Sequence, residues 1–160
     1  MELVHLQHPD GRTALEKGDV DAWAGLDPHM AASEIQAGSR LLYRNKAFNS
    51  YGVVSVTEKF AKEHPQTITK VLGAYEKARD WAVKHPDEFA KLLADESGLP
   101  LEVAKLQLSR TDLSTPFLSS KDVLSSKAAA PILVSEALVR KGVVDLLRDI
   151  GSMPGLNELV

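Results

Sequence analysis

The chain has 160 residues, of which 44% are hydrophobic and 26% charged, and its formal net charge at pH 7 is -3. This length is enough for one ordinary domain with a sizeable core, and the composition is that of a globular protein rather than a disordered or fibrous one. The small net charge gives no reason to expect nucleic acid or a membrane surface as a partner. Because the chain has no cysteine, disulfides and thiol chemistry are excluded.

No apolar run approaches the ~18 residues that a membrane span needs. The first residues, MELVHLQHPDG, lack the basic region, apolar region and cleavage site of a signal peptide. We therefore expect neither a spanning helix nor a signal peptide in this chain.

In the first 56 residues the sequence predicts four short strands and two helices. The strands are apolar or β-branched runs between turn residues, and they cover residues 2–6, 21–25, 40–44 and 51–56. Asp10 is a candidate N-cap for a short helix that Gly18 ends. Asp27 is a candidate cap for a second helix, with Pro28 at its first position and an end near Ala37. This alternation is the pattern of an α/β sheet, so the predicted fold class is α/β with a small mixed sheet in residues 1–56.

The remaining residues contain no convincing strand, and an all-helical C-terminal half is expected. Three prolines open predicted helices there, namely Pro65, Pro86 and Pro100. A further long helix is expected over residues 120–141, with Pro131 inside it, and a short last one over VVDLLRDI. So few strands beside so many amphipathic helices indicate part of a larger architecture.

Two stretches carry a resemblance to a known family. Residues 12–43, RTALEKGDVDAWAGLDPHMAASEIQAGSRLLY, contain the pattern A-L-x-x-G-x-V-D-A-W followed by Asp-Pro and a helix. From Ser50, an extended Y-G-x-x-x-V leads to F-x-x-x-H-P and a long helix. In order and spacing, these motifs resemble bacterial ABC-transporter substrate-binding proteins, most closely the branch that serves aliphatic sulfonates, taurine and nitrate.

The resemblance implies a partial type II periplasmic-binding-protein fold, in which crossing strands join two α/β lobes and ligand binds in the cleft between them. Residues 1–48 would be the closing half of the second lobe. Residues 49–56 would be the hinge crossover strand, and residues 57–160 the helical part of the first lobe. The strands of the first lobe and much of the ligand pocket would lie outside this chain.

The function that the resemblance implies is that of a solute-binding component of an ABC importer, or a fragment of one. The ligand would be a small anionic or zwitterionic solute, bound without covalent chemistry and without a cofactor. Closure of the lobes would create the form that the membrane permease subunits recognise. The full-length protein would be periplasmic, or lipid-anchored outside the cytoplasm.

Six residues are candidate ligand contacts, namely Trp23, Asp27, His29, Asn49, Ser50 and Tyr51. By resemblance, Asp27 would face the cleft, where a carboxylate makes charge-assisted bonds to a substrate ammonium group. Trp23 would offer an apolar wall with one N–H donor. Each has a structural alternative, because Asp27 equally fits a helix cap and Trp23 a core position. His29 and Met30 stand at a helix start, where backbone N–H groups bind anions, and the other three belong to the hinge.

Neither a catalytic nor a metal site is expected. The five histidines show no set of three at the spacing of a zinc site, and no G-x-S-x-G, P-loop or G-x-G-x-x-G motif occurs. Two alternatives stay open. One is an enzyme similar to the pyrimidine-precursor synthases of thiamine metabolism, with His29 as its candidate histidine. The other is a truncated, non-binding product that self-associates through an exposed sheet edge.

Overall fold

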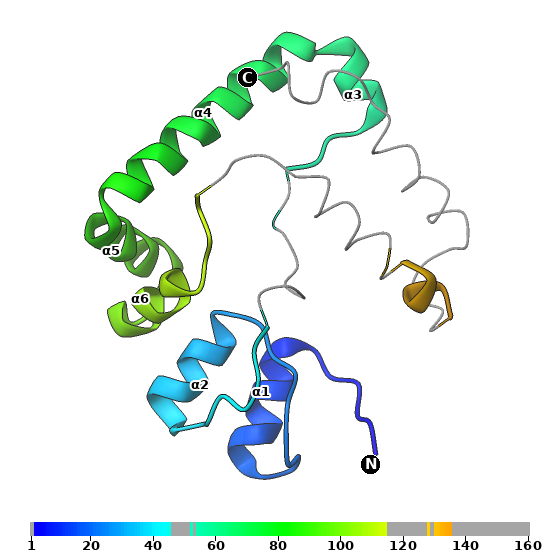
Figure 1. The fold of residues 1–160 in the computed structure, drawn as a ribbon, viewed down its shortest axis with the longest axis vertical. Helices are drawn as coiled ribbons and strands as arrows, with labels where there is room; N and C mark the ends of the chain where they lie inside the picture. The colour runs from blue at the N-terminus through cyan, green and yellow to red at the C-terminus, as the bar shows by residue number, and fades with distance from the viewer. Residues whose placement is uncertain (1, 46–51, 53, 115–127, 129, 136–160) are drawn as a thin grey trace. The chain divides into compact units, whose positions relative to one another are not determined.

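Figure 1 shows the chain as a computed structural model, which describes residues 2–45, 52, 54–114, 128 and 130–135. Within these residues the labelled helices are α1 (His8–Lys17), α2 (His29–Ala37), α3 (Glu58–Glu63), α4 (Pro65–Lys84), α5 (Pro86–Ser97) and α6 (Leu101–Ser109). Residues 128 and 130–135 are also helical. In this part of the chain, no helix is long and apolar enough to cross a membrane.

The chain divides into two units, each made of two separate stretches. Unit 1 comprises Met1–Arg44 and Trp81–Leu113, and unit 2 comprises Asn45–Asp80 and Ser114–Val160. Helices α1, α2, α5 and α6 therefore belong to unit 1, whereas α3 and most of α4 belong to unit 2.

The predicted small mixed sheet is wrong, because the described part of residues 1–56 contains no strand. Residues 2–6, 21–25 and 40–44 are irregular, and so are residues 52 and 54–56 of the fourth predicted strand. A β-rich segment becomes a strand only where a neighbour exchanges backbone hydrogen bonds with it. The described segments do not pair in this way.

Exposure of their side chains agrees with this correction. Leu42 and Tyr43 are 70% and 72% exposed, although a strand normally buries one face of a sheet. The α/β class, with its partial type II fold, is thus replaced by helices and irregular segments in the described residues. The sheet edge predicted for self-association is absent from the same part of the chain.

Helix ends follow local signals, several of them as predicted. Gly18 ends α1 with a φ of 79°, in the left-handed region that favours glycine. Pro65 and Pro86 begin α4 and α5, which confirms both predicted starts. However, α1 begins at His8, ahead of its predicted cap at Asp10.

The prediction did not include α3. Thr57 caps this short helix, and its hydroxyl accepts a hydrogen bond from the N–H of Phe60 at 3.2 Å. Most of the helix predicted over residues 120–141, and all of the predicted last helix, lie outside the described residues.

The core of unit 1 is built from small side chains on α2 and α6. Ala31, Ala32 and Val103 are buried together, and Leu99 and Leu106 pack against them. Small residues let helices approach closely, so this core fixes α2 against α6.

Helix α5 packs on the same α6, and the buried residues of α5 are Ala90 and Ala94. On α6, Val103 and Ala104 are buried. Leu92 of α5 is 47% exposed. The alanines, rather than the leucine, form the inner face of α5.

Candidate functional site

Asp27 lies directly before α2, joined to Pro28 by a cis peptide bond. Its Oδ1 accepts a hydrogen bond from the N–H of Ala31 at 3.0 Å. The N–H groups of Met30 and Ala32 donate to backbone carbonyls 3.1 Å and 2.9 Å away. Because these donors already have acceptors within the chain, these three backbone N–H groups are poorly suited to hold an anion.

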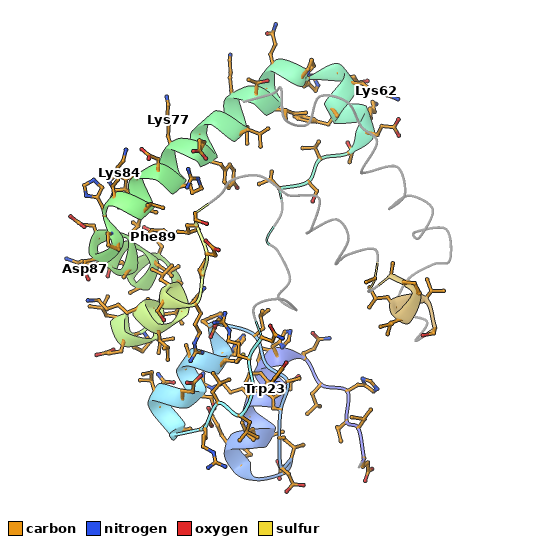
Figure 2. The ribbon with its side chains drawn as sticks, viewed as in Figure 1. Trp23, Lys62, Lys77, Lys84, Asp87 and Phe89 are labelled. Carbon is orange, nitrogen blue, oxygen red and sulfur yellow. The ribbon has the colours of Figure 1, made fainter. Side chains whose placement is uncertain are left out.

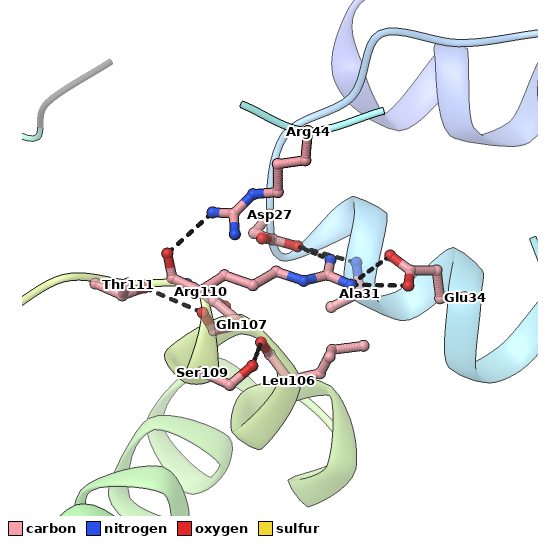
Figure 3. A network of polar contacts seen from close by, with 9 residues as sticks. All are labelled: Asp27, Ala31, Glu34, Arg44, Leu106, Gln107, Ser109, Arg110 and Thr111. Carbon is pink, nitrogen blue, oxygen red and sulfur yellow. Dashed lines mark hydrogen bonds and ion pairs between the residues drawn. The ribbon is translucent and has the colours of Figure 1, made fainter. Parts of the chain in front are cut away.

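Arg110, which follows α6, points at Asp27 and Glu34 (Figure 3). Its Nη2 lies 2.7 Å and 2.8 Å from the two carboxylate oxygens of Glu34, and its Nη1 lies 3.4 Å from Oδ1 of Asp27. The side chains of Arg110, Asp27 and Glu34 are 10%, 17% and 22% exposed. The backbone carbonyl of Arg110 accepts a hydrogen bond from Nη2 of Arg44 at 2.9 Å. We call Asp27, Glu34, Arg44 and Arg110 the Arg110 cluster.

The formal charges of the Arg110 cluster sum to zero, with two guanidinium groups and two carboxylates. Hydrogen bonds between such groups are about twice as strong as neutral ones, and loss of one partner leaves a partly buried charge uncompensated. Asp27 and Glu34 are seven residues apart, about two helical turns, so they lie on the same side of α2, where the Arg110 guanidinium contacts both. The cluster joins α2, the segment at Arg44 and the end of α6 within unit 1, and its geometry is suited to holding them together.

Trp23 lies beside α1 (Figure 2), where two glycines make room for its indole. A Cβ on Gly25 would lie 2.6 Å from ring carbon Cη2, and a Cβ on Gly11 would overlap Nε1. The imidazole of His8 meets the indole edge-on, with ring centroids 6.4 Å apart. The contacts of Trp23 in the described residues are therefore packing contacts within unit 1.

The remaining sequence candidates divide into two groups. His29 is the first residue of α2, and it is partly exposed. Asn49, Ser50 and Tyr51 lie outside the described residues. Trp23, Asp27 and His29 lie in one short stretch of sequence before and at the start of α2, without a hydrogen bond, ion pair or ring contact among them in the described residues.

A second polar cluster joins α1 to α2. Nε of Arg12 lies 2.6 Å from the Glu16 carboxylate, and its Nη2 donates to the side-chain oxygen of Gln36 at 2.8 Å. The hydroxyls of Ser33 and Ser39 are 2.6 Å apart. The hydrogen bond from Arg12 holds the pKa of the Glu16 carboxyl below its ordinary value of 4.5, against the opposing effect of desolvation.

An open groove of about 340 Å³ lies between the N-terminal segment and α1. Its lining residues are Val4, Leu6, Asp10, Thr13, Ala14, Asp19 and Val20. The lining combines apolar side chains with two carboxylates, and none of these described residues is basic. This groove is therefore unsuited to an anionic solute.

No metal site was predicted. Among the described residues, no group of three or more histidine, aspartate or glutamate side chains is placed to hold a metal ion.

The sequence did not predict a role for Glu34, Arg44 or Arg110. One signal was present, because an acidic residue seven positions after Asp27 falls on the same side of a helix. Arg110, which binds this acidic pair, is 76 residues beyond Glu34. At that separation the spacing of residues in the sequence gives no indication of a contact.

Comparison with known proteins identifies the family. Residues 1–89, more than half of the chain, match the family described as NMT1/THI5 like. The chain therefore belongs to the NMT1/THI5-like family.

Two curated relatives are named as aliphatic sulfonates-binding proteins. One, from Bacillus subtilis (strain 168), is 28% identical over 130 residues, and the other, from Escherichia coli (strain K12), is 31% identical over 104 residues. The matches cover 80% and 64% of this chain but only 39% and 33% of the relatives, so the chain spans about two fifths and one third of their lengths. These relatives confirm the resemblance to the aliphatic sulfonate branch. No solved structure gives a significant match to the chain.

Proposed function

We propose that this chain supplies part of the solute-binding component of an ABC importer for small aliphatic sulfonates. The observation that carries the proposal is the match of 80% of the chain to a relative named for binding aliphatic sulfonates. Membership of the NMT1/THI5-like family over residues 1–89 supports it independently. In this role the protein acts outside the cytoplasm, binds its solute non-covalently in a cleft between two lobes and presents it to the permease subunits.

The proposed role is non-catalytic and needs no cofactor. Both matched relatives are named as binding proteins. The Arg110 cluster supports this role as well, because the carboxylates of Asp27 and Glu34 face a guanidinium group. A carboxylate that is held against a guanidinium group within the chain is poorly placed to act on a substrate.

Four residues of the chain are proposed to contact the solute, namely His29, Asn49, Ser50 and Tyr51. Their side chains carry N–H or O–H donors, which a sulfonate requires. Residues 49–56 are proposed as the hinge. Trp23 and Asp27 are proposed to support the site indirectly, because their observed contacts lie within the chain.

Isothermal titration calorimetry of the purified chain with propane-1-sulfonate tests the proposal. Butanoate is the matched control ligand, because it carries the same propyl group on a carboxylate instead of a sulfonate. Saturable binding of the sulfonate alone supports the proposal, whereas equal or absent heats for both ligands contradict it. Taurine and nitrate, titrated in the same way, then rank the solutes.

A variant pair tests the contribution of His29. If its imidazole donates to the sulfonate, we expect His29→Ala to weaken binding by about tenfold, the effect of losing one hydrogen bond to a charged group. His5→Ala is the control, since His5 is an exposed histidine of the N-terminal segment. Equal affinities of the two variants would remove His29 from the proposed site.

A further inference from the structure

The groove between the N-terminal segment and α1 combines apolar side chains with two carboxylates. Val4 and Leu6 line it and stay largely exposed to solvent. Asp10 and Asp19 line it as well, and both are exposed. Within the described residues, neither carboxylate takes part in an ion pair. The groove therefore offers apolar surface and two uncompensated negative charges to a molecule that lies in it.

Residues 40–44, with the sequence Arg-Leu-Leu-Tyr-Arg, have the complementary chemistry. Leu42 and Tyr43 are among the most exposed large hydrophobic residues of the described chain. Arg40 is exposed too, and its side chain has no ion pair or hydrogen bond within the described residues. Arg44 anchors the other end of the segment through its hydrogen bond to a backbone carbonyl of unit 1. One short segment thus presents apolar side chains next to an available positive charge.

The availability of the positive charge distinguishes this segment from α3, where an exposed phenylalanine also stands between basic residues. Phe60 lies between Lys59 and Lys62, but these lysines are 4.0 Å and 2.6 Å from carboxylates of the same helix. Arg40 has no such partner among the described residues. Since opposite charges across an interface favour the matching partner, the acidic groove fits residues 40–44 better than α3.

We propose that two copies of this chain associate, with residues 40–44 of each copy lying in the groove of the other. In a two-fold arrangement this contact occurs twice, so both grooves and both segments are covered together. Burial of the apolar side chains drives the association, and Arg40 of one copy, placed against Asp10 and Asp19 of the other, sets its register. The contact needs no sheet edge. The inference goes beyond the proposed function, because it concerns the chain without any solute.

Sedimentation equilibrium of the whole chain at several concentrations measures the association. We expect the mean mass to rise with concentration from that of one chain to that of two. A mass of one chain throughout the measured range overturns the proposal. A continuing increase beyond two chains also overturns it, because a two-fold contact closes on itself.

The variant Leu42→Asp tests the apolar part of the contact. It places a further carboxylate opposite Asp10 and Asp19, so we expect the dissociation constant to rise about tenfold or more. Leu92→Asp is the matched control, since Leu92 is an exposed leucine of α5 in the same unit, and it should associate like the parent chain. Equal weakening in both variants overturns the proposed contact. Circular dichroism checks that each variant is folded.

Charge reversal tests the register. Arg40→Glu brings like charges together in the proposed contact, and so does the double variant Asp10→Lys/Asp19→Lys. Each should stay a single chain at concentrations where the parent chain is paired. Mixed in equal amounts, the two variants should associate with each other, because both contacts of the pair then join opposite charges.

Failure of this mixture to associate overturns the proposed register. If the double variant does not fold, the comparison of Leu42→Asp with Leu92→Asp still decides, because both replace exposed side chains. None of these measurements needs a solute, so their outcome is separate from that of the sulfonate titration.

Discussion

One nitrogen of Arg110, Nη2, bridges both carboxylate oxygens of Glu34 at 2.7 Å and 2.8 Å. The contact joins α2 to the end of α6 beside a core in which Val103 is the largest fully buried hydrophobic side chain. Small side chains each bury little apolar area. The polar contacts around them are therefore expected to contribute much of the free energy that fixes the orientation of the helices. The stability of unit 1 is accordingly expected to depend on this ion pair.

Removal of the guanidinium tests this dependence. We expect Arg110→Met to lower the free energy of unfolding by about 1–3 kcal/mol, because it leaves two carboxylates uncompensated in a partly buried site. Urea denaturation followed by circular dichroism measures the loss. In a double-mutant cycle with Glu34→Gln, we expect a coupling energy of about 1 kcal/mol or more. Strictly additive losses would show that the observed contact contributes nothing.

Asp27 makes two contacts, and two substitutions at this position distinguish their contributions to stability. Asp27→Ala removes the acceptor of the Ala31 N–H and the charge near Arg110, and we expect a loss of about 1–2 kcal/mol, as for a helix cap. Asp27→Asn keeps an acceptor oxygen and should lose less. Urea midpoints of the two variants make the comparison. Equal losses would assign the effect to the charge and not to the hydrogen bond.

The packing of Trp23 predicts that one methyl group added at Gly11 lowers the stability of the chain. A Cβ at Gly11 would overlap the indole, so we expect Gly11→Ala to destabilise the chain by about 1–3 kcal/mol, the usual effect of overpacking. Gly73→Ala is the control, because Gly73 lies within α4 with nothing near its Cβ position. There we expect a gain of up to about 1 kcal/mol in helix stability. Thermal unfolding distinguishes the two, and a neutral Gly11→Ala would contradict the packing described for Trp23.

Predictions from the sequence were correct where a residue determines the conformation of its own backbone. Gly18 ends α1 and Pro86 begins α5 as predicted, because left-handed backbone and first-turn geometry are local properties of glycine and proline. It failed for residues 40–44, whose apolar and aromatic side chains favour a strand in any sequence-based estimate. Strand formation also requires a partner, and propensity carries no information about whether one is present.

In the candidate site, too, local properties could be predicted from the sequence, whereas contacts between distant residues could not. The position of Asp27 before a helix followed from the sequence, and so did its capacity to bind a backbone N–H of the first turn. Its neighbour Arg110 did not, because contact across 83 residues depends on how α6 packs on α2. The family could be inferred at once, since the motifs around Trp23 and Asp27 are contiguous in the chain.

The ion pair of Glu16 with Arg12 predicts a pH dependence of stability. The pKa of Glu16 is lowered in the folded chain, chiefly by the hydrogen bond from Arg12. Where folding lowers a carboxyl pKa, the unfolded state binds more protons between the two pKa values, so stability falls as the pH falls. The contribution of Glu16 is therefore complete above its ordinary pKa of 4.5 and is lost as the pH drops through the lower folded value.

We expect the unfolding free energies of the parent chain and of Glu16→Gln, plotted against pH, to converge at low pH. The free energy of unfolding, measured in urea from pH 7 down to pH 3, should differ between the parent chain and Glu16→Gln by a constant amount above pH 4.5 and converge below it. Glu96→Gln, which removes an exposed carboxylate from α5, controls for the change in net charge. Because the bond joins residues four apart on an accessible helix face, the difference above pH 4.5 should be about 0.5 kcal/mol. A difference that grows as the pH falls would show that Glu16 is stabilised in its protonated form, against the geometry of its contact with Arg12.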